Sequence, residues 1–443
     1  MNFAKQGWLK RYLEFRSGHP FADRLPSSGV KVLEDAGMHH ELDESIYYFL
    51  QPTGLLYGFP VGLPFPEPEY PKVSYLSALD RAHLIFLDSL FACLVADRHY
   101  LLDDLADEAD HFPPAVAMAT SYFQGPDGDA RPARASLGGW LRGAGRGGGH
   151  ARLERALRRQ IGKGAEIFRL PGRYYNSFLF LDLYYCMAWQ RRMLVEPEGA
   201  AVHHRELGQR QQEQRELLIR VMIAAAASSG GVARAEQRLV EWFIRSSGLP
   251  PERIAALREA LRQGRMLDGD SLPDMPWLVR RFMLDAALMT ILVDRELDPA
   301  EERFLDALVE RLELWKEELS QSLVALEVFI LHQEPQLQIF HDRPALLNAS
   351  DHIRSRASLM IRKNLNRIVQ EIRETQELYN LLMKSTHMPL TPEEKRKVRL
   401  QLLDILKTIP ALAIFALPGG SLVLPVLIRL LPFNLLPSAF EED

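Results

Sequence analysis

Hydrophobic positions along this chain recur mainly at the three- and four-residue spacing of an α-helix, and they seldom alternate as in a strand. Between Ser77 and His111 this spacing predicts a long helix, which the Pro113-Pro114 pair is expected to end. Ahead of it, residues up to about 75 combine short apolar runs with proline and glycine turns, and we expect an extended segment packed around a helical body. The pattern as a whole predicts an all-α, multi-domain fold.

A second apolar block, residues 173–189, has the sequence RYYNSFLFLDLYYCMAW. Apolar side chains fall on every side of the predicted helix and only Asp182 interrupts them, which is typical of a buried helix. Stacking of the aromatic rings on nucleic-acid bases is the alternative. We expect core packing.

The middle of the chain contains an internal repeat with an offset of 65 residues. The run Ala235-Glu236-Gln237-Arg238-Leu239 in the first copy corresponds to Ala300-Glu301-Glu302-Arg303-Phe304 in the second. Each copy is predicted to form an apolar helix, a short polar turn and a second, amphipathic helix. This arrangement resembles the TerB-like domain of tellurite-resistance proteins, and the resemblance implies acidic, metal-associated turns.

The turn of the second copy holds the weak metal candidates that this resemblance suggests, namely Asp294, Glu296 and Asp298. The corresponding positions of the first copy are Ser229, Gly231 and Ala233. A simpler interpretation places Asp298 at the N-cap of a helix, with Pro299 at the first helical position and Glu301 completing a capping box worth about 1 kcal/mol. We expect the capping role, and the sequence predicts no metal and no other cofactor.

The most apolar stretch is the last one, from Thr408 to Phe440, which carries no charge between Lys407 and Arg429. Prolines and a glycine pair interrupt it, at Pro410, Pro418, Gly419, Gly420, Pro425, Pro432 and Pro437. Each interior proline removes a helix hydrogen bond at a cost of about 3 kcal/mol or more. The stretch is therefore predicted to form short apolar helices joined by tight turns, which pack against a helical domain, enter a membrane partway or bind a partner.

These spaced prolines, with the PGG triplet at 418–420 and the LLPS run at 435–438, resemble the signature of the Letm ribosome-binding-like domain. That family comprises the leucine-zipper, EF-hand, transmembrane proteins of the mitochondrial inner membrane and their bacterial relatives. The opening Gly7-Trp8-Leu9 and the chain length resemble the bacterial Letm-related proteins linked to biofilms. The resemblance implies a helical C-terminal domain that binds ribosomes, with links to cation homeostasis, envelope stress and biofilm formation.

The helices predicted to lead into this stretch are locally basic. The Thr391-Pro392-Glu393-Glu394 sequence predicts a capping box at the start of the last of them. Candidates for contact with ribosomal RNA or with anionic lipid headgroups follow, namely Lys395, Arg396, Lys397, Arg399, Lys407 and Arg429. A solvated charged face is the plain alternative. At a bilayer centre Arg429 would cost about 2.5–3.5 kcal/mol, which disfavours deep insertion.

The overall composition limits the partners and the compartment. A net charge of -5 gives no global signal for nucleic-acid binding, so such a partner has to use a local patch. Two cysteines, Cys93 and Cys186, make no disulfide framework and suit a reducing cytosol, and the N-terminus lacks an apolar secretory core. We therefore expect a cytoplasmic protein, with peripheral attachment to the inner membrane as an option.

Residues 125–150 are rich in glycine and arginine and are predicted to form a flexible loop. The loop contains a G-x-G-x-x-G spacing at Gly143, Gly145 and Gly148, without the preceding strand that a dinucleotide-binding turn requires. The arginines in and after the loop form a local basic tract. A solvated face is the expected role of this tract, and contact with phosphates is the alternative.

The most enzyme-like pattern is Asp103-Asp104-Leu105-Ala106-Asp107, in which Asp103 and Asp107 share one face of a helix. Prenyl-diphosphate enzymes use a D-D-x-x-D pattern to hold magnesium against a diphosphate, a ligand set that magnesium prefers. Those enzymes also need a second acidic motif, and the sequence offers no convincing one. The sequence therefore identifies no small-molecule substrate.

The predicted organisation, in chain order, is an N-terminal helical region with a proline-rich extended segment (1–124), the flexible loop (125–150), aromatic-rich helices (151–212), the TerB-like repeat (213–345) and the Letm-like domain (346–443). The leading hypothesis is a non-enzymatic interaction protein that binds ribosomes. A membrane-embedded ion-transport component and a magnesium-dependent enzyme are the alternatives. The sequence leaves the oligomeric state open.

Overall fold

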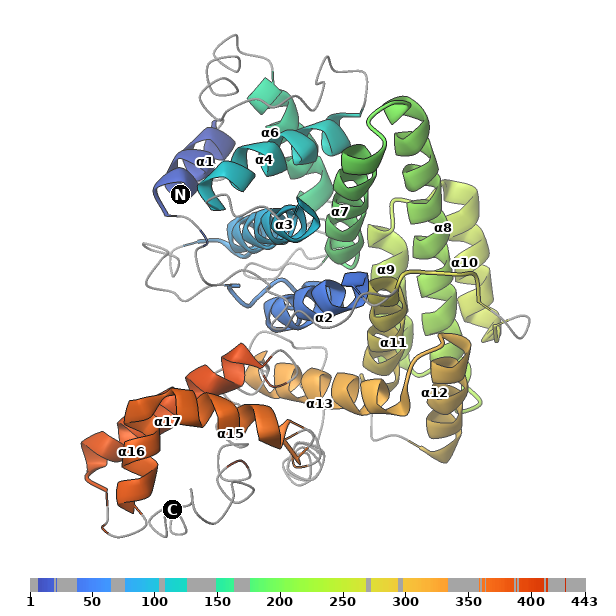
Figure 1. Ribbon diagram of the computed structural model, residues 1–443. Helices are drawn as coiled ribbons and strands as arrows, with labels where there is room; N and C mark the ends of the chain where they lie inside the picture. The colour runs from blue at the N-terminus through green and yellow to red at the C-terminus, as the bar shows by residue number, and fades with distance from the viewer. Residues whose placement is uncertain are drawn as a thin grey trace. The chain divides into compact units, whose positions relative to one another are not determined.

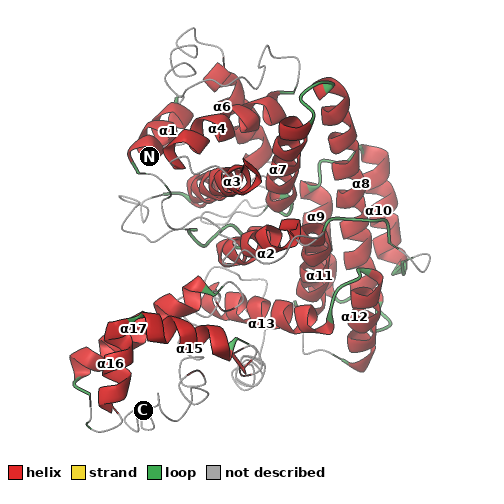
Figure 2. Cartoon of the chain, in the orientation of Figure 1, coloured by secondary structure: helices red, strands yellow, loops and turns green. Residues whose placement is uncertain are grey.

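The structure is a computed structural model, and it describes the chain in segments separated by gaps. The described residues are 7–19, 21, 38–64, 76–102, 108–125, 149–162, 176–267, 272–293, 298–333, 358, 361–362, 364–385, 388, 390–409, 412 and 427. All regular structure within these residues is helical, and no strand occurs among them (Figure 2). The predicted all-α fold is confirmed.

The chain divides into two compact units. The first contains Met1–Gly269 and Pro273–Thr290, and the second contains Asp270–Leu272 and Ile291–Asp443. The division falls inside the predicted repeat region, residues 213–345. The first copy of the repeat therefore lies in the first unit, whereas the turn and the second helix of the second copy lie in the second unit.

In the first unit, α3 (Ala78–Leu102) packs against α4 (Glu108–Gln124), α6 (Gly149–Ile161) and α7 (Leu179–Val195) (Figure 1). Every residue of α3 from Ala82 to Asp97 is buried. A helix that is covered on all sides needs apolar residues on all sides, and this stretch of α3 has them. It forms the centre of the unit.

The described part of the aromatic run predicted to be a buried helix, residues 176–189, lies in α7 and the turn before it. Phe180 and Trp189 are fully buried, and Tyr184 and Tyr185 are less than a tenth exposed. The core-packing interpretation is confirmed for these described rings, because rings covered on all faces by protein are not accessible to bases.

The helices near the N-terminus are α1 (Trp8–Gly18), which packs on α6, and α2 (Met38–Leu50), which packs on α3. Two 3-10 turns follow α2, at Gln51–Thr53 and Leu55–Tyr57. The expected extended segment is therefore wrong for these described residues. Local hydrogen bonds and left-handed glycines close the turns instead of leaving the chain extended.

Pro113 and Pro114 do not end a helix as expected. Both lie inside α4, and the preceding helix α3 is described as far as Leu102. The hydrogen bonds that the prolines remove fall in the first turns of α4, while Ala115 and Val116 just beyond them are fully buried. Tertiary packing therefore outweighs the local preference of the two prolines.

The 65-residue repeat is confirmed as a repeat of helices. The first copy consists of α8 (Ala200–Ala227), α9 (Arg234–Ser246) and α10 (Pro251–Gln263). The second copy consists of α11 (Trp277–Leu292), α12 (Pro299–Arg311) and α13 (Lys316–Gln333). The end of the first helix, both ends of the second and the start of the third all shift by 65 residues.

The two copies also share the turn that ends their second helix. Gly248 after α9 has a φ of 67°, and Glu313 at the equivalent position after α12 has a φ of 51°. Glu313 is the one non-glycine residue with positive φ in the described part of the chain. The second copy therefore keeps the left-handed turn without a glycine, at a steric cost of about 1–2 kcal/mol.

In the second unit, α15 (Leu365–Glu374), α16 (Gln376–Ser385) and α17 (Pro392–Thr408) pack against one another. They share one apolar cluster with Val324 and Val328 of α13. The main contributions of the three C-terminal helices to this cluster are Ile368, Ile372, Leu378, Leu382, Val398, Leu402, Ile405 and Leu406.

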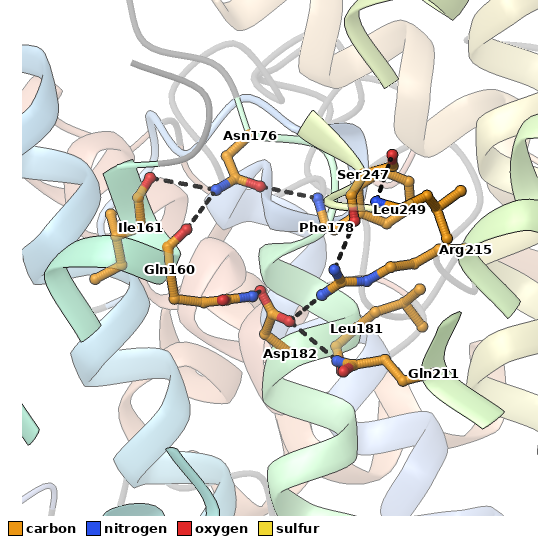
Figure 3. A network of polar contacts seen from close by, with 10 residues as sticks. All are labelled: Gln160, Ile161, Asn176, Phe178, Leu181, Asp182, Gln211, Arg215, Ser247 and Leu249. Atoms are coloured by element: carbon orange, nitrogen blue, oxygen red, sulfur yellow. Dashed lines mark hydrogen bonds and ion pairs between the residues drawn. The ribbon is translucent and has the colours of Figure 1, made fainter. Parts of the chain in front are cut away.

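The first unit, in contrast, buries charged groups between its helices. Asp182 on α7 forms an ion pair with Arg215 of α8 and accepts hydrogen bonds from Gln160 of α6 and from Gln211 Nε2 of α8, the last at 3.0 Å (Figure 3). Arg215 Nη1 also donates to the backbone oxygen of Ser247 at 2.7 Å. Both charged side chains are less than a tenth exposed, so this network ties α6, α7, α8 and the end of α9 together.

Three further ion pairs, formed by two arginines, lie in the same unit. Arg16 of α1 pairs with Asp88 of α3 at 2.7 Å, and both side chains are almost completely buried. Arg191 of α7 lies between Asp97 of α3, at 2.6 Å, and Asp43 of α2, at 2.8 Å. Burial raises the pKa of Asp97 although the guanidinium opposes this effect.

Candidate functional site

Helix α17 begins at the capping box that the sequence predicts. Thr391 Oγ1 accepts a hydrogen bond from the Glu394 amide at 3.2 Å, and Glu394 Oε2 accepts one from the Thr391 amide at 2.9 Å. Pro392 occupies the first helical position, where its missing amide hydrogen costs nothing. The start of α17 is therefore fixed by local sequence.

Two ion pairs orient α17 on α16. Lys384 Nζ, in the last turn of α16, lies 2.5 Å from Glu394 Oε1, and Lys397 pairs with Glu377 in the first turn of α16. Gln401 Nε2 adds a hydrogen bond to Glu377 at 2.8 Å. The bond from Lys397 lowers the pKa of Glu377, and the bond from Lys384 lowers the pKa of Glu394.

These pairs separate the basic candidates on α17 into two groups. Lys397 is exposed but its charge is paired with Glu377, and Lys395 is half-buried. Arg396 and Arg399 are exposed, and neither forms an ion pair with any residue that the structure describes. Among the described side chains of α17, Arg396 and Arg399 are thus the exposed cations without an ion pair.

Arg396 and Arg399 lie on the side of α17 that faces away from the apolar cluster. Leu400, one turn after Arg396, is 52% exposed on that side. Lys407 follows Arg396 by eleven residues, close to three full turns of helix, so its backbone position falls on the same side. We call Arg396, Arg399 and Leu400 the outer face of α17.

The opposite side of α17 meets the core together with two residues of the apolar C-terminal stretch. Leu412 and Leu427 are fully buried in the cluster that holds Val398 and Leu402. Of the three predicted roles for the stretch, packing against the helical domain is the one that these two residues support.

Several sequence-predicted site residues lie outside the described residues. For the C-terminal motif these are Pro410, Pro418, Gly419, Gly420, Pro425, Arg429, Pro432 and Pro437. The same holds for Asp103, Asp104 and Asp107 of the enzyme-like pattern, for residues 126–148 of the glycine-rich loop, and for Asp294 and Glu296 of the acidic turn. Lys407 is described in its backbone only.

Asp298, the remaining residue of the acidic turn, has the predicted capping role. Its Oδ1 accepts hydrogen bonds from the amides of Ala300 at 2.6 Å and Glu301 at 2.8 Å, and Glu301 Oε2 accepts the Asp298 amide at 2.9 Å. In the part of the chain that the structure describes, no three histidine, cysteine or acidic side chains gather as they would around a metal ion.

Sequence reasoning missed the pairing of Lys397 with Glu377 and therefore treated the basic residues of α17 as equivalent. The signal was weak, because the two residues are 20 positions apart and on different helices.

Among the described residues, no helix combines the length and the apolar character that crossing a membrane requires.

The fold and the site define an all-α protein with a basic outer face on the helix that opens its C-terminal segment. Residues 390–443, which begin just before α17, match the family model described as LETM1-like, RBD. The resemblance of this segment to that family is therefore confirmed, whereas the TerB-like resemblance of the repeat and the biofilm link stay predictions. No curated protein and no solved structure matches the chain.

Proposed function

We propose that this protein is a non-enzymatic, ribosome-binding protein that contacts ribosomal RNA through the outer face of α17. One observation carries the proposal: the segment that matches the LETM1-like, RBD model opens with a helix that exposes Arg396 and Arg399 without an ion-pair partner among the described residues. We interpret RBD as a ribosome-binding domain.

The chemistry of the outer face suits phosphate groups. Arginine presents a planar fork of donors that can bind a phosphate through two hydrogen bonds, and its charge persists at any physiological pH. Because Arg396 and Arg399 have no ion pair to give up within the described structure, binding a phosphate breaks no existing salt bridge. Leu400 beside them adds apolar area to the contact.

The physiological setting that we propose is the inner face of the bacterial inner membrane, with the protein attached peripherally while bound to ribosomes. A role in cation homeostasis, envelope stress or biofilm formation would follow from that location. This part of the proposal rests on the resemblance to the Letm family. The surface that would meet anionic lipid is the same outer face, since lipid headgroups also present phosphates.

The proposal is tested by cosedimentation of the full chain with purified ribosomes over a range of salt concentrations. The Arg396→Glu, Arg399→Glu variant should lose most of its ribosome binding, and the slope of log affinity against log salt should fall by about 2, or about 1 for each phosphate contact. Mixing with phosphatidylglycerol vesicles in a parallel flotation assay separates ribosome binding from lipid binding.

The matched control is the Arg238→Glu, Arg303→Glu variant. These arginines occupy equivalent exposed positions in the two copies of the repeat, on α9 and α12, so the change in net charge is identical. The control should bind ribosomes like the wild type. Equal binding by both variants would remove the outer face from the proposal.

A further inference from the structure

Helix α6, in the first unit, exposes a row of arginines that the proposed function does not use. Leu153, Leu157 and Ile161 bury one side of the helix completely. The other side carries Arg155, Arg158 and Arg159, all exposed. We call these three residues the arginine face of α6.

The acidic residue of α6 does not neutralise this face. Glu154 is 4% exposed, and its two carboxylate oxygens accept the Gly7 amide at 3.0 Å, while Oε2 also accepts the Leu9 amide at 3.5 Å. Its charge is thus directed at the positive N-terminal end of α1. Arg158 approaches Glu154 at 3.7 Å, but Arg155 and Arg159 form no ion pair with a described residue.

The arginines are not needed to cap the C-terminal end of α6 either. Asn176 Nδ2 donates to the backbone oxygens of Gln160 at 3.0 Å and Ile161 at 3.2 Å (Figure 3). Arginines in a last turn often satisfy such carbonyls. Here a buried asparagine does so. Arg155 Nε donates to the backbone oxygen of Ala151 in the same helix at 3.2 Å, and both Arg155 and Arg159 are exposed.

The chemistry of this face and of the adjoining sequence points to RNA. We propose that the arginine face of α6 binds the phosphate backbone of single-stranded RNA, as a contact separate from the outer face of α17. The sequence that precedes α6 reads GGWLRGAGRGGG over 138–149, and arginine-glycine segments with an aromatic residue are typical of proteins that bind single strands.

A lipid surface fits the same face less well. A helix that binds a membrane needs an apolar side to insert below the headgroups. The apolar side of α6 is already buried in the first unit, and its described side chains include no exposed large hydrophobic residue. The exposed groups of α6 that can bind a ligand are therefore its guanidinium groups, whose paired N–H donors match phosphate oxygens.

The test measures fluorescence anisotropy of a labelled oligouridylate of about 16 nucleotides, a site size within the range for single-strand binders. The full chain carries Arg396→Gln and Arg399→Gln, so that α17 contributes little. Adding Arg155→Gln, Arg158→Gln and Arg159→Gln should weaken binding at least about tenfold at low salt. The slope of log affinity against log salt concentration should become less steep by about 2, because each phosphate contact on a single strand contributes about 0.7.

The matched control replaces Arg205, Arg210 and Arg238, three exposed arginines of α8 and α9, by glutamine in the same background. It should keep the affinity and the slope. An Arg→Lys version of the α6 variant should keep the slope because the charge is retained, and it covers the case in which the glutamine version misfolds. Both α6 variants should show the circular dichroism spectrum of the parent chain.

An unchanged salt slope in the folded glutamine variant would overturn the proposal, as would an equal loss in the control. Loss of binding to phosphatidylglycerol vesicles with RNA binding intact would overturn it in favour of lipid. The result is independent of the ribosome assay. If α17 variants leave ribosome binding unchanged while the α6 variant loses RNA, the α17 proposal fails and this one stands.

Discussion

The contacts between helices include buried ion pairs in the first unit, whereas the C-terminal helices meet through apolar residues. Between its helices the first unit buries Arg16 with Asp88 and Arg215 with Asp182. The cluster shared by α13 and α15 to α17 is built from apolar residues, and the arginines of α17 lie on its outside. The guanidinium groups of Arg16 and Arg215 are therefore part of the structure of the first unit, whereas those of Arg396 and Arg399 lie on the surface of α17.

The difference shows that the expected effect of removing an arginine depends on whether it is buried in an ion pair or exposed. A buried ion pair gains little net stability over an apolar pair, but removing one partner leaves a charge without compensation. An exposed arginine can be removed at almost no cost to folding. Substitutions should therefore disturb stability at the buried arginines and binding at the exposed ones.

The largest expected effect is on Arg215. Replacing it by alanine leaves the Asp182 carboxylate buried without its ion pair, and the free energy of unfolding should fall by about 3–5 kcal/mol. Urea denaturation followed by circular dichroism measures the change. Arg220→Ala, five residues later on α8, breaks the half-exposed pair with Glu216 and should cost no more than about 1 kcal/mol. Similar losses in both variants would show that burial of the pair does not matter.

Next in size is the apolar cluster of the C-terminal helices. Leu402→Ala removes a fully buried side chain and should lower the free energy of unfolding by about 2–5 kcal/mol. Leu400→Ala, two residues earlier on the outer face, should change it by less than about 0.5 kcal/mol. Differential scanning calorimetry of the two variants compares the two sides of one helix. A large loss from Leu400→Ala would place that residue in a core and not on a binding face.

A smaller effect is expected at the start of α17. Thr391→Ala removes the hydroxyl that accepts the Glu394 amide, and it should cost about 1 kcal/mol. Thr391→Ser keeps the acceptor and serves as the control in the same denaturation experiment. If the alanine and serine variants are equally stable, the capping box does not fix the start of the helix.

The smallest effect is the response of the two surface ion pairs to acid. The pKa values of Glu377 and Glu394 are lowered in the folded state. The two ionised carboxylates therefore stabilise the fold above the pKa of about 4.3 that glutamate has in the unfolded chain. This contribution is lost as the pH falls through the lowered folded-state pKa values. Glu377→Gln, Glu394→Gln should therefore lower the melting temperature at pH 7 and have no effect at pH 2. A difference that persists at pH 2 would point to lost packing.

Local features of the fold could be predicted from the sequence, and distant pairings could not. The capping boxes at Asp298 and Thr391 depend on residues three positions apart, and the 65-residue repeat is visible as a pattern. Arg16 and Asp88 lie 72 positions apart, and no periodicity connects them. The Pro113-Pro114 prediction failed for a related reason, since packing against other helices decided the outcome.

The candidate site was predictable in the same partial way. Sequence located the basic helix and its family resemblance, but all four basic residues between Lys395 and Arg399 looked alike. The structure shows that Lys397 pairs with Glu377 of α16, whereas Arg396 and Arg399 have no ion pair with a described residue. Which arginine is available depends on a contact between helices, which the sequence does not display.

The most direct test of the ribosome proposal places a photo-crosslinking amino acid at one of two positions. The first is Leu400, beside the two arginines of the outer face of α17, and the second is Val195, which is 84% exposed in the first unit. Each protein is irradiated with purified ribosomes, and crosslinked RNA is mapped by primer extension. The account predicts a defined ribosomal RNA crosslink from position 400 that high salt abolishes, and none at the same RNA site from position 195. Absence of any RNA crosslink from position 400, while the protein cosediments with ribosomes, would contradict it.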